Sequence, residues 1–495
     1  PAEWMTYRDE KNEPPKPDFF FTKYNIYLEH WAIGKNGKVP EWFESNNPTE
    51  GYKLGMDKKK KEFDSQNEFI LIESSHADYQ KGDLIEKVKE KFLKALKEKY
   101  PKENFVLELK PYDELVNQVW EECKLFVKKI ADNISTFIEI AKTYSIKPEE
   151  LDKRVKDSNW PLKQRTFAKI ANRVYRYYQN DLSQNNEMDF YDMINLAVDL
   201  LKNNPDFYKD KYNHILVDEY QDISNQRYLL LKQLMLKNKD CKLFCVGDDW
   251  QSIMGFSGSN IKFFVEFEKF FSHCARTDLS NNYRSVSEIV NTGAHIIKHN
   301  GNVQLTKVTK AHSKNSGQLT VYSSSHKLDN YKSYKNKVLY LKQVCGHAVD
   351  KMEELFKKGY KPNDILCLSR ITSNPIFVNL LVDIASKKGI TIALNTKSPK
   401  KVTLMSVHKS KGLQAKIVFL FNVDQGTYGF PCEINNPKIY EIATNEKNEN
   451  KEEEERRLFY VAVTRAKHEV LIYNRHDTQS KFITEIKDFV KREII

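Results

Sequence analysis

Residues 214–222 read HILVDEYQD, an apolar run that ends in two adjacent acids. In open α/β folds, ligands bind in the crevice at the carboxyl ends of the strands, so this pattern places two carboxylates in a crevice. One carboxylate can hold Mg²⁺ on a nucleotide while the next orients an attacking water. Asp218 fits the metal role and Glu219 the base role. An acidic turn after a strand is a common alternative, but the continuation YQD makes a chance match far rarer.

The next apolar run, LFCV at 243–246, is followed by GDDWQS and then by FSGS. This pattern predicts a second edge that faces the same nucleotide. There Gln251 can sense a γ-phosphate through a hydrogen bond that is lost when the phosphate leaves. Phe256 stands in a glycine-flanked turn, where an exposed ring is costly. A stacking platform for a nucleic-acid base, worth about 1–3 kcal/mol per base, would explain it. An ordinary buried phenylalanine would explain it equally well.

Short apolar runs alternate with segments of helical length from about residue 212 onward. These runs are HILV, KLFCV, QLTVY, DILCLS, VTLMSV, IVFLF and EVLIY. Apolar runs of four to six residues with intervening helices are typical of buried parallel strands in layered α/β folds. Residues 1–75 indicate a small α/β unit, whereas 80–205 has a helical pattern.

Composition sets outer limits on the function. The chain has 495 residues, which is more than one hydrophobic core usually holds, and its formal charge of +11 favours a polyanionic partner. No stretch approaches the roughly 18–20 apolar residues of a membrane span, so we expect no membrane partner. Seven cysteines without a CxxC pair argue against a zinc site or a disulfide framework. We therefore expect a reducing, cytoplasmic location.

Three basic motifs follow the two acidic ones: LSNNYRS (279–285), VTLMSVHKSKGLQA (402–415) and EERRLFYVAVTRAK (454–467). Arginine suits phosphoryl transition states because its planar fork spans two oxygens and stays charged. Arg465 comes directly after an apolar helical run, which would hold it rigidly, as an arginine finger must be held. Taken singly, each of these charges is more often a solvated surface residue.

Together, DEYQD, VGDDWQS, NYRS, HKSKGLQA and RRLFYVAVTRAK resemble motifs II to VI of the Rep/UvrD-type superfamily 1 DNA helicases, in the family's order. FSG after the third motif, GTYGFP after KGLQA, and PDFFFTKYNIYLEHW near the start most resemble the helicase IV branch. The resemblance implies an ATP-dependent 3′→5′ DNA helicase or translocase of DNA repair. It also implies ATP and Mg²⁺ as cofactors and single-stranded or 3′-tailed DNA as the partner.

By position in these motifs, the resemblance implies a role for each residue. Asp218 and Glu219 would handle Mg²⁺ and water, while Gln251, Arg284 and Arg465 would contact the γ-phosphate. The nucleotide would further meet Gln221, Tyr283, Gly412 and Gln414, and DNA would meet Phe256, His408, Lys409 and Lys411.

One family motif is missing. The pattern G-x-x-x-x-G-K-[ST], whose amides and lysine cradle phosphates, does not occur in the sequence. In the family this motif precedes the region that Pro1 opens, so we expect the chain to be a truncated part of a longer parent and inactive alone. The alternative, from another class, is a non-catalytic DNA-binding or scaffold protein derived from a helicase. A phosphate loop upstream in the parent reading frame would favour the motor.

We expect an α/β fold with two RecA-like P-loop NTPase domains, the first one incomplete. The predicted order is a nuclease-like insert at 1–78, a helical 1B-like subdomain at 79–205, the C-terminal part of the first RecA-like domain at 206–290 and the second at 291–495, without a large 2B insertion.

Asp18 and Glu29 resemble the D…E-x-K spacing of the restriction-endonuclease fold, in which carboxylates on adjacent strands hold Mg²⁺. The third position is Trp31 instead of lysine, so the activating base is absent. A degenerate nuclease-like insert is therefore favoured over a live nuclease.

Overall fold

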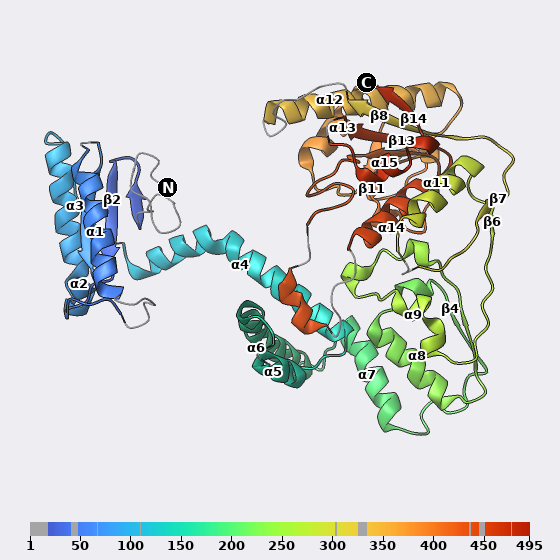
Figure 1. Cartoon of the computed structure of the whole chain (residues 1–495), viewed down its shortest axis with the longest axis horizontal. Helices are drawn as coiled ribbons and strands as arrows, with labels where there is room; N and C mark the ends of the chain where they lie inside the picture. Colours follow the sequence, from blue (N-terminus) through green and yellow to red (C-terminus); the bar gives the residue numbers. More distant parts are fainter. Residues whose placement is uncertain are drawn as a thin grey trace. The chain divides into compact units, whose positions relative to one another are not determined.

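The computed structural model describes residues 18–40, 48–66, 68–108, 110–157, 159–301, 304–324, 334–434, 437–444, 451–476 and 478–495. The chain has a mixed α/β fold, as the alternating apolar runs predicted, and it divides into two compact units, Pro1–Leu125 and Phe126–Ile495 (Figure 1). Within the described part, no helix is both long enough and apolar enough to cross a membrane.

The first unit is a three-stranded sheet packed against helices. Its elements are β1 (Phe19–Phe21), β2 (Ile26–Trp31), α1 (Pro48–Asp64), β3 (Ile70–Ser75), α2 (His76–Lys81) and α3 (Leu84–Lys99). β1 runs antiparallel to β2, and β3 runs parallel to it. Because side chains alternate along a strand, Ile26 packs in the α3 core while its neighbour Tyr27 packs against Phe63 of α1.

The first structural boundary lies after Leu125, later than the predicted boundary between 78 and 79. The reason is α3, which buries Phe92 and Leu96 against Ile26 and Ile72 of the sheet. The whole stretch 80–205 has helical periodicity, and periodicity alone does not tell which helices pack on the sheet.

The carboxylate of Glu29 is buried and paired with a lysine. Asp18 lies one residue beyond the Phe19–Leu28 pair, and its carboxylate accepts a hydrogen bond of 2.7 Å from the backbone N–H of His30. Lys59 of α1 places its Nζ 2.5 Å from Glu29 Oε1, and both side chains are at least nine-tenths buried. A lysine therefore does reach the acid, from α1 instead of from position 31 of β2.

We predict that Lys59→Met destabilises the first unit by about 3–5 kcal/mol at pH 7, because the substitution leaves a buried carboxylate unpaired. Burial raises the pKa of Glu29, and Lys59 opposes that rise. Without Lys59 the pKa rises further, so the folded unit holds a proton that the unfolded chain has released. The destabilisation should therefore shrink as the pH falls toward 5.

Hydrogen exchange of the β2 amides at pH 7 and pH 5 measures this effect. The matched control is Lys60→Met, because the ion pair of Lys60 with Glu73 is about one-third exposed and should contribute less than about 1 kcal/mol. Equal losses of stability in the two variants would mean that the buried ion pair stabilises the unit no more than the exposed one does.

The second unit opens with a helical part. Its elements are α4 (Tyr112–Thr143), which begins in the first unit, α5 (Pro148–Lys156), α6 (Leu162–Gln184), α7 (Phe190–Asn203) and the later turn η6 (Lys438–Ala443). Phe137 and Leu151 centre a core that also buries Ile442 and Ala443 of η6. This helical part is therefore packed against a segment that lies almost 300 residues further along the chain.

Two parallel strands come next. The elements are β4 (His214–Val217), η1 (Tyr220–Asp222), α8 (Asn225–Lys237), β5 (Lys242–Cys245), η2 (Asp249–Gln251), η3 (Gly255–Ser257), α9 (Lys262–Val265) and α10 (Phe267–Phe270). One face, with Ile215 and Leu243, packs against the helices. On the other face, Leu216 is 72% and Phe244 61% exposed. The prediction of fully buried strands is thus wrong for one face of this pair within the described residues.

The C-terminal part is a seven-stranded sheet in the order β10-β11-β9-β12-β13-β8-β14, in which every pairing is parallel. Its strands are β8 (Gln318–Ser324), β9 (Ile365–Ser369), β10 (Ile392–Leu394), β11 (Val402–Ser406), β12 (Ala415–Phe421), β13 (Ala466–Arg475) and β14 (Lys491–Ile494). Its helices are α11 (Ser287–Lys298), α12 (Tyr334–Lys357), α13 (Pro375–Lys387), α14 (Lys451–Val463) and α15 (Lys481–Glu485). All of the apolar runs predicted as strands here are strands.

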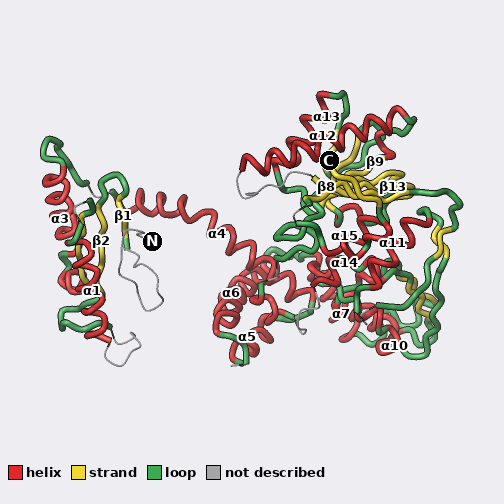
Figure 2. The backbone as a smooth tube through the Cα atoms, turned by 45° about the horizontal axis from the view of Figure 1, so that its top comes forward, coloured by secondary structure: helices red, strands yellow, loops and turns green. Residues whose placement is uncertain are grey.

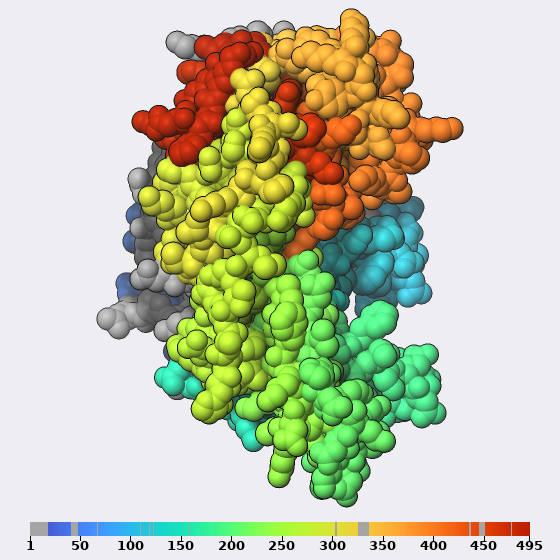
Figure 3. All heavy atoms as spheres, turned by 90° about the vertical axis from the view of Figure 1, so that its right-hand side faces the viewer, coloured from blue at the N-terminus to red at the C-terminus, as the bar shows by residue number. Residues whose placement is uncertain are grey.

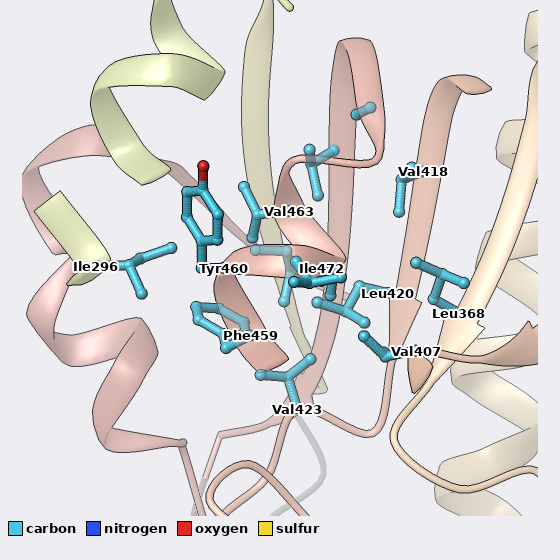
Figure 4. Close-up of a cluster of buried hydrophobic side chains, with 14 of the residues drawn as sticks. Ile296, Leu368, Val407, Val418, Leu420, Val423, Phe459, Tyr460, Val463 and Ile472 are labelled. Atoms are coloured by element: carbon cyan, nitrogen blue, oxygen red, sulfur yellow. The ribbon is translucent and has the colours of Figure 1, made fainter. Parts of the chain in front are cut away.

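Two cores cover this sheet, one on each face. α12 and α13 pack on one face, and α11, α14 and α15 pack on the other (Figures 1 and 2). Figure 4 shows Phe459 and Val463 of α14 among Leu420, Val423 and Ile472. The short pair β6 (Asn281–Asn282) and β7 (Lys310–Ala311) lies in the yellow-green to yellow segment of Figure 3, which joins the β4–β5 part to this sheet.

Candidate functional site

The loops at the carboxyl ends of β4 and β5 are tied together by Gln221. Its Nε2 donates to Glu219 Oε2 (2.5 Å), and its Oε1 accepts from the backbone N–H of Asp248 (2.9 Å). Gln221 is completely buried. A nucleotide contact of Gln221 remains a prediction, and in the structure this residue links the two acidic loops.

Asp218 and Glu219 lie exposed at the end of β4. Glu219 has a φ of +50°, in the left-handed region, and its backbone N–H donates to Asp218 Oδ1 (2.9 Å). A non-glycine residue in this region costs about 1–3 kcal/mol, and such strain is concentrated at functional sites. Two exposed neighbouring carboxylates fit Mg²⁺ carried on a nucleotide, because this ion commonly takes one or two carboxylates plus phosphate oxygens. The described residues contain no group of three metal-ligating side chains.

The loops after β4 and β5 form one wall of the site, and the guanidinium of Arg465 forms the other. Arg465 follows α14 and is completely buried. It donates to Gln251 Oε1 (3.0 Å), Val461 O (3.0 Å) and Leu413 O (3.2 Å). Gln251 in turn donates from Nε2 to Asp248 Oδ2 (2.5 Å). The structure therefore brings together the glutamine and the arginine that the sequence assigned to the γ-phosphate.

Arg284 adds a second positive charge beside Arg465. Burial, and after it the charge of Arg284, lower the pKa of Arg465 to about 10, so the Arg465 guanidinium stays charged at neutral pH. Among the described residues, neither arginine forms an ion pair with a carboxylate. Two neighbouring cations that form no ion pair with a described carboxylate can attract an anion.

The resemblance implied a DNA contact for Lys411, and this contact remains a prediction. In the structure the side chain of Lys411 is 13% exposed and forms an ion pair with Asp222. Its Nζ also donates to Gln251 O (3.0 Å) and lies 3.8 Å from Glu219 Oε2. Burial raises the pKa of Asp222, and Lys411 opposes this rise. Lys411 therefore connects the segment before β12 to both acidic loops. Lys409 is exposed.

Phe256 is 57% exposed, so it is not the buried phenylalanine of the alternative interpretation. Its ring meets the ring of His408 edge-on, at 5.2 Å between centroids and 90° between planes. Burial lowers the pKa of His408 to about 4, so this ring is neutral at neutral pH. The pair presents an uncharged aromatic surface.

The three remaining predicted nucleotide contacts are exposed. Tyr283 is 72% exposed, with its ring 4.5 Å from that of His312. Gly412 has a φ of +78°, and Gln414 is exposed beside it. Among the described contacts, none links the side chains of Tyr283 and Gln414 to the Gln251–Arg465 pair.

Lys307 is a residue that the sequence did not single out. It forms ion pairs with Asp248 and with the completely buried Asp249, at 2.8 Å from Asp249 Oδ1, and its Nζ lies 4.6 Å from the centre of the Trp250 ring. It thereby places one positive charge beside both acids of the loop after β5. Lys307 lies more than 50 residues after these acids and belongs to none of the sequence motifs, so nothing in the sequence indicated its role.

Two family models match these elements. The UvrD/REP helicase N-terminal domain matches residues 49–272, and the UvrD-like helicase C-terminal domain matches residues 349–476. The chain belongs to the UvrD/REP helicase family. Both walls of the site, from Asp218 to Gln251 and from Lys411 to Arg465, lie within the matched regions.

Named helicases of this family are similar to the chain over part of their length. DNA helicase IV of Escherichia coli K12 is 29% identical over 322 residues, which cover 65% of this chain and 42% of the relative. ATP-dependent DNA helicase PcrA of Staphylococcus epidermidis is 35% identical over 31% of the chain and 20% of the relative. DNA helicase II of Rickettsia typhi is 36% identical over 30% of the chain and 22% of the relative. The chain thus spans less than half of the length of each of these UvrD/REP-type relatives.

We predict that His408 makes stability depend on pH below neutrality. Its folded pKa of about 4 lies below the usual value of 6.5, so the unfolded chain binds a proton that the folded chain does not. Stability should therefore fall by about 2 kcal/mol between pH 7 and pH 5 on this account. Urea denaturation of the parent and of His408→Asn at both pH values measures it. The same pH dependence in both proteins would refute the assignment.

Proposed function

We propose that this chain is the DNA-contacting and phosphate-sensing part of an ATP-dependent 3′→5′ DNA helicase or single-strand translocase. The observation that carries the proposal is the Arg465–Gln251 hydrogen bond of 3.0 Å. It joins the loop after β5 to Arg465, which follows α14, and both Arg284 and Glu219 act electrostatically on this arginine. The three helicase relatives support the same activity.

In this proposal each wall has its own task. Asp218 binds the Mg²⁺ of a bound nucleotide, and Glu219 accepts a proton from the attacking water and orients it. Arg284 and Arg465 stabilise the negative charge that develops on the transferred phosphoryl group. Bound ATP would supply the phosphoanhydride bond that is broken, and Mg²⁺ would supply positive charge at its phosphates. The chain's own residues orient the water and stabilise the charge of the phosphates. Gln251 senses whether the γ-phosphate is present.

In this proposal DNA contacts the exposed aromatic surface formed by Phe256 and His408, and the cations near it. Phe256 offers a face on which a base can stack, His408 backs it without charge, and Lys409 is free to meet a phosphate. The net charge of +11 supports a polyanionic partner. Single-stranded or 3′-tailed DNA is therefore the proposed substrate, in a repair process.

The domain roles follow the same proposal. The helical part from α4 to α7 would be the 1B-like subdomain, the β4–β5 part would belong to the first RecA-like domain, and the seven-stranded sheet would be the second. The first unit would be a degenerate nuclease-like insert, since a buried ion pair with Lys59 already engages Glu29. All seven cysteines are free, which supports a reducing compartment such as the cytoplasm.

We predict that this chain alone hydrolyses ATP negligibly, with or without DNA. The sequence contains no G-x-x-x-x-G-K-[ST] loop, so the β- and γ-phosphates lack the amide and lysine cradle that usually holds them. A phosphate-release assay with saturating single-stranded DNA measures turnover. DNA-stimulated hydrolysis of many cycles per minute would show that other residues hold the phosphates.

We also predict that the chain binds single-stranded DNA with an affinity that falls steeply as salt rises. Phe256→Ala should weaken binding by about 5- to 150-fold, the size of a lost base stack, without changing the salt slope, because no charge is removed. Fluorescence anisotropy on an oligothymidine at several salt concentrations measures both quantities. Phe190→Ala, which removes an 85% exposed ring on α7, is the control. Binding that does not respond to salt would contradict the proposal.

A further inference from the structure

One face of α14 contacts the loop after β5 at three points. Arg457 Nε donates to Ser252 O (2.7 Å), and the ring of Tyr460 meets Trp250 edge-on, with 5.6 Å between ring centroids. One turn earlier on the helix, the carboxylate of Glu454 accepts from the backbone N–H of Gly255 (2.9 Å). Positions 454, 457 and 460 recur every three residues, which places them along one side of the helix.

The contact of Glu454 depends on a glycine. A Cβ at position 255 would lie 2.9 Å from both carboxylate oxygens of Glu454, so a larger residue would push the acid away. On the far side of the turn, Gly258 has a φ of +86°, and a Cβ there would meet Thr143 of α4 at 2.3 Å. The turn that carries Phe256 is therefore closely packed at both ends.

Glu454 has no motif role that explains this position. Burial raises the pKa of its carboxyl, while Arg457 and the N–H of Gly255 oppose that rise and favour the charged form. The hydrogen bond of 2.9 Å attaches α14 to the backbone directly before Phe256.

We propose that Glu454 is a positioning residue for Phe256, and that α14 thereby links the phosphate-sensing Arg465–Gln251 pair to the DNA platform. Along α14, Glu454 and the residues just before Arg465 are separated by roughly 15 Å at 1.5 Å per residue. The inference rests on the proposed role of Phe256 in binding single-stranded DNA. It adds the residue that holds this ring in place.

Equilibrium binding of oligothymidine by the full chain tests the proposal. Glu454→Ala removes the acceptor and should weaken binding about 3- to 10-fold, a part of the loss that a full base stack represents. Glu454→Gln keeps an acceptor oxygen at the same reach and should stay within about twofold of the parent, although it removes the same charge. Gly255→Ala displaces the carboxylate from the other side and should behave like Glu454→Ala.

The matched control is Glu452→Ala. It removes the same charge from the same helix, but its carboxylate pairs with Lys481 and Arg456 and does not contact the loop. It should leave the affinity within about twofold of the parent. Thermal melting of all variants checks that each is folded.

A second readout separates positioning from general structural damage. In Phe256→Ala, the further change Glu454→Ala should cost no more affinity, because the ring on which it acts is already gone. An oligonucleotide that carries 2-aminopurine reports stacking directly, and its quenching by the protein should drop in Glu454→Ala and be kept in Glu454→Gln.

The two proposals fail in different ways. If Phe256→Ala binds like the parent, the DNA platform is wrong, and the inference falls with it. If Phe256→Ala weakens binding while Glu454→Ala matches the parent in affinity and quenching, only the role of Glu454 is overturned. Additive losses in the double variant would likewise reject an action through Phe256.

Discussion

A buried guanidinium must find acceptors for its N–H groups while keeping its charge, and Arg465 meets this constraint at the junction of α14 and β13. Two of its acceptors, Val461 O and Leu413 O, are backbone atoms of its own domain. The third, Gln251, lies on the loop after β5. An unsatisfied buried donor costs about 1–3 kcal/mol, and more when it is charged. The arginine therefore holds that loop against the part of the chain that carries the seven-stranded sheet, and the contacts of Lys411, Arg457 and Tyr460 can form beside it.

The same constraint explains how β4 and β5 keep their place. Two parallel strands do not make an independently stable sheet, and one face of this pair exposes Leu216 and Phe244. Its other face packs on the helices that follow it. Its carboxyl end is tied by Gln221 within the pair and by Lys411 and Arg465 to the part that carries the seven-stranded sheet. The strands are thus fixed most firmly at the edge where their acids lie.

How much of this the sequence could predict differs between elements. The parallel strands were predicted correctly because a run of four to six apolar residues has few other places in a layered fold. The partnership of Gln251 and Arg465 could be expected only from the motif resemblance, since the two residues are more than 200 positions apart. The inward position of Lys411 and the link made by Gln221 were not predicted, because a motif names a residue type and does not give the direction of its side chain. Lys59 and Lys307 were missed because their acid partners lie on other elements.

On the proposed function, the nature of the Arg465–Gln251 bond decides how the site responds to a nucleotide. The bond joins a cation to a neutral amide, and a phosphate oxygen offers the same cation a charge-assisted bond that is roughly twice as strong. A γ-phosphate therefore competes with Gln251 for Arg465. Gln251 cannot swing freely when it is displaced, because Asp248 holds its amide nitrogen and Lys307 holds Asp248. Its movement must be taken up by the backbone that follows, through Ser252 and Gly255, which α14 grips at two points. Phe256 is the next residue, so a change at the phosphate has a path of five residues to the base platform.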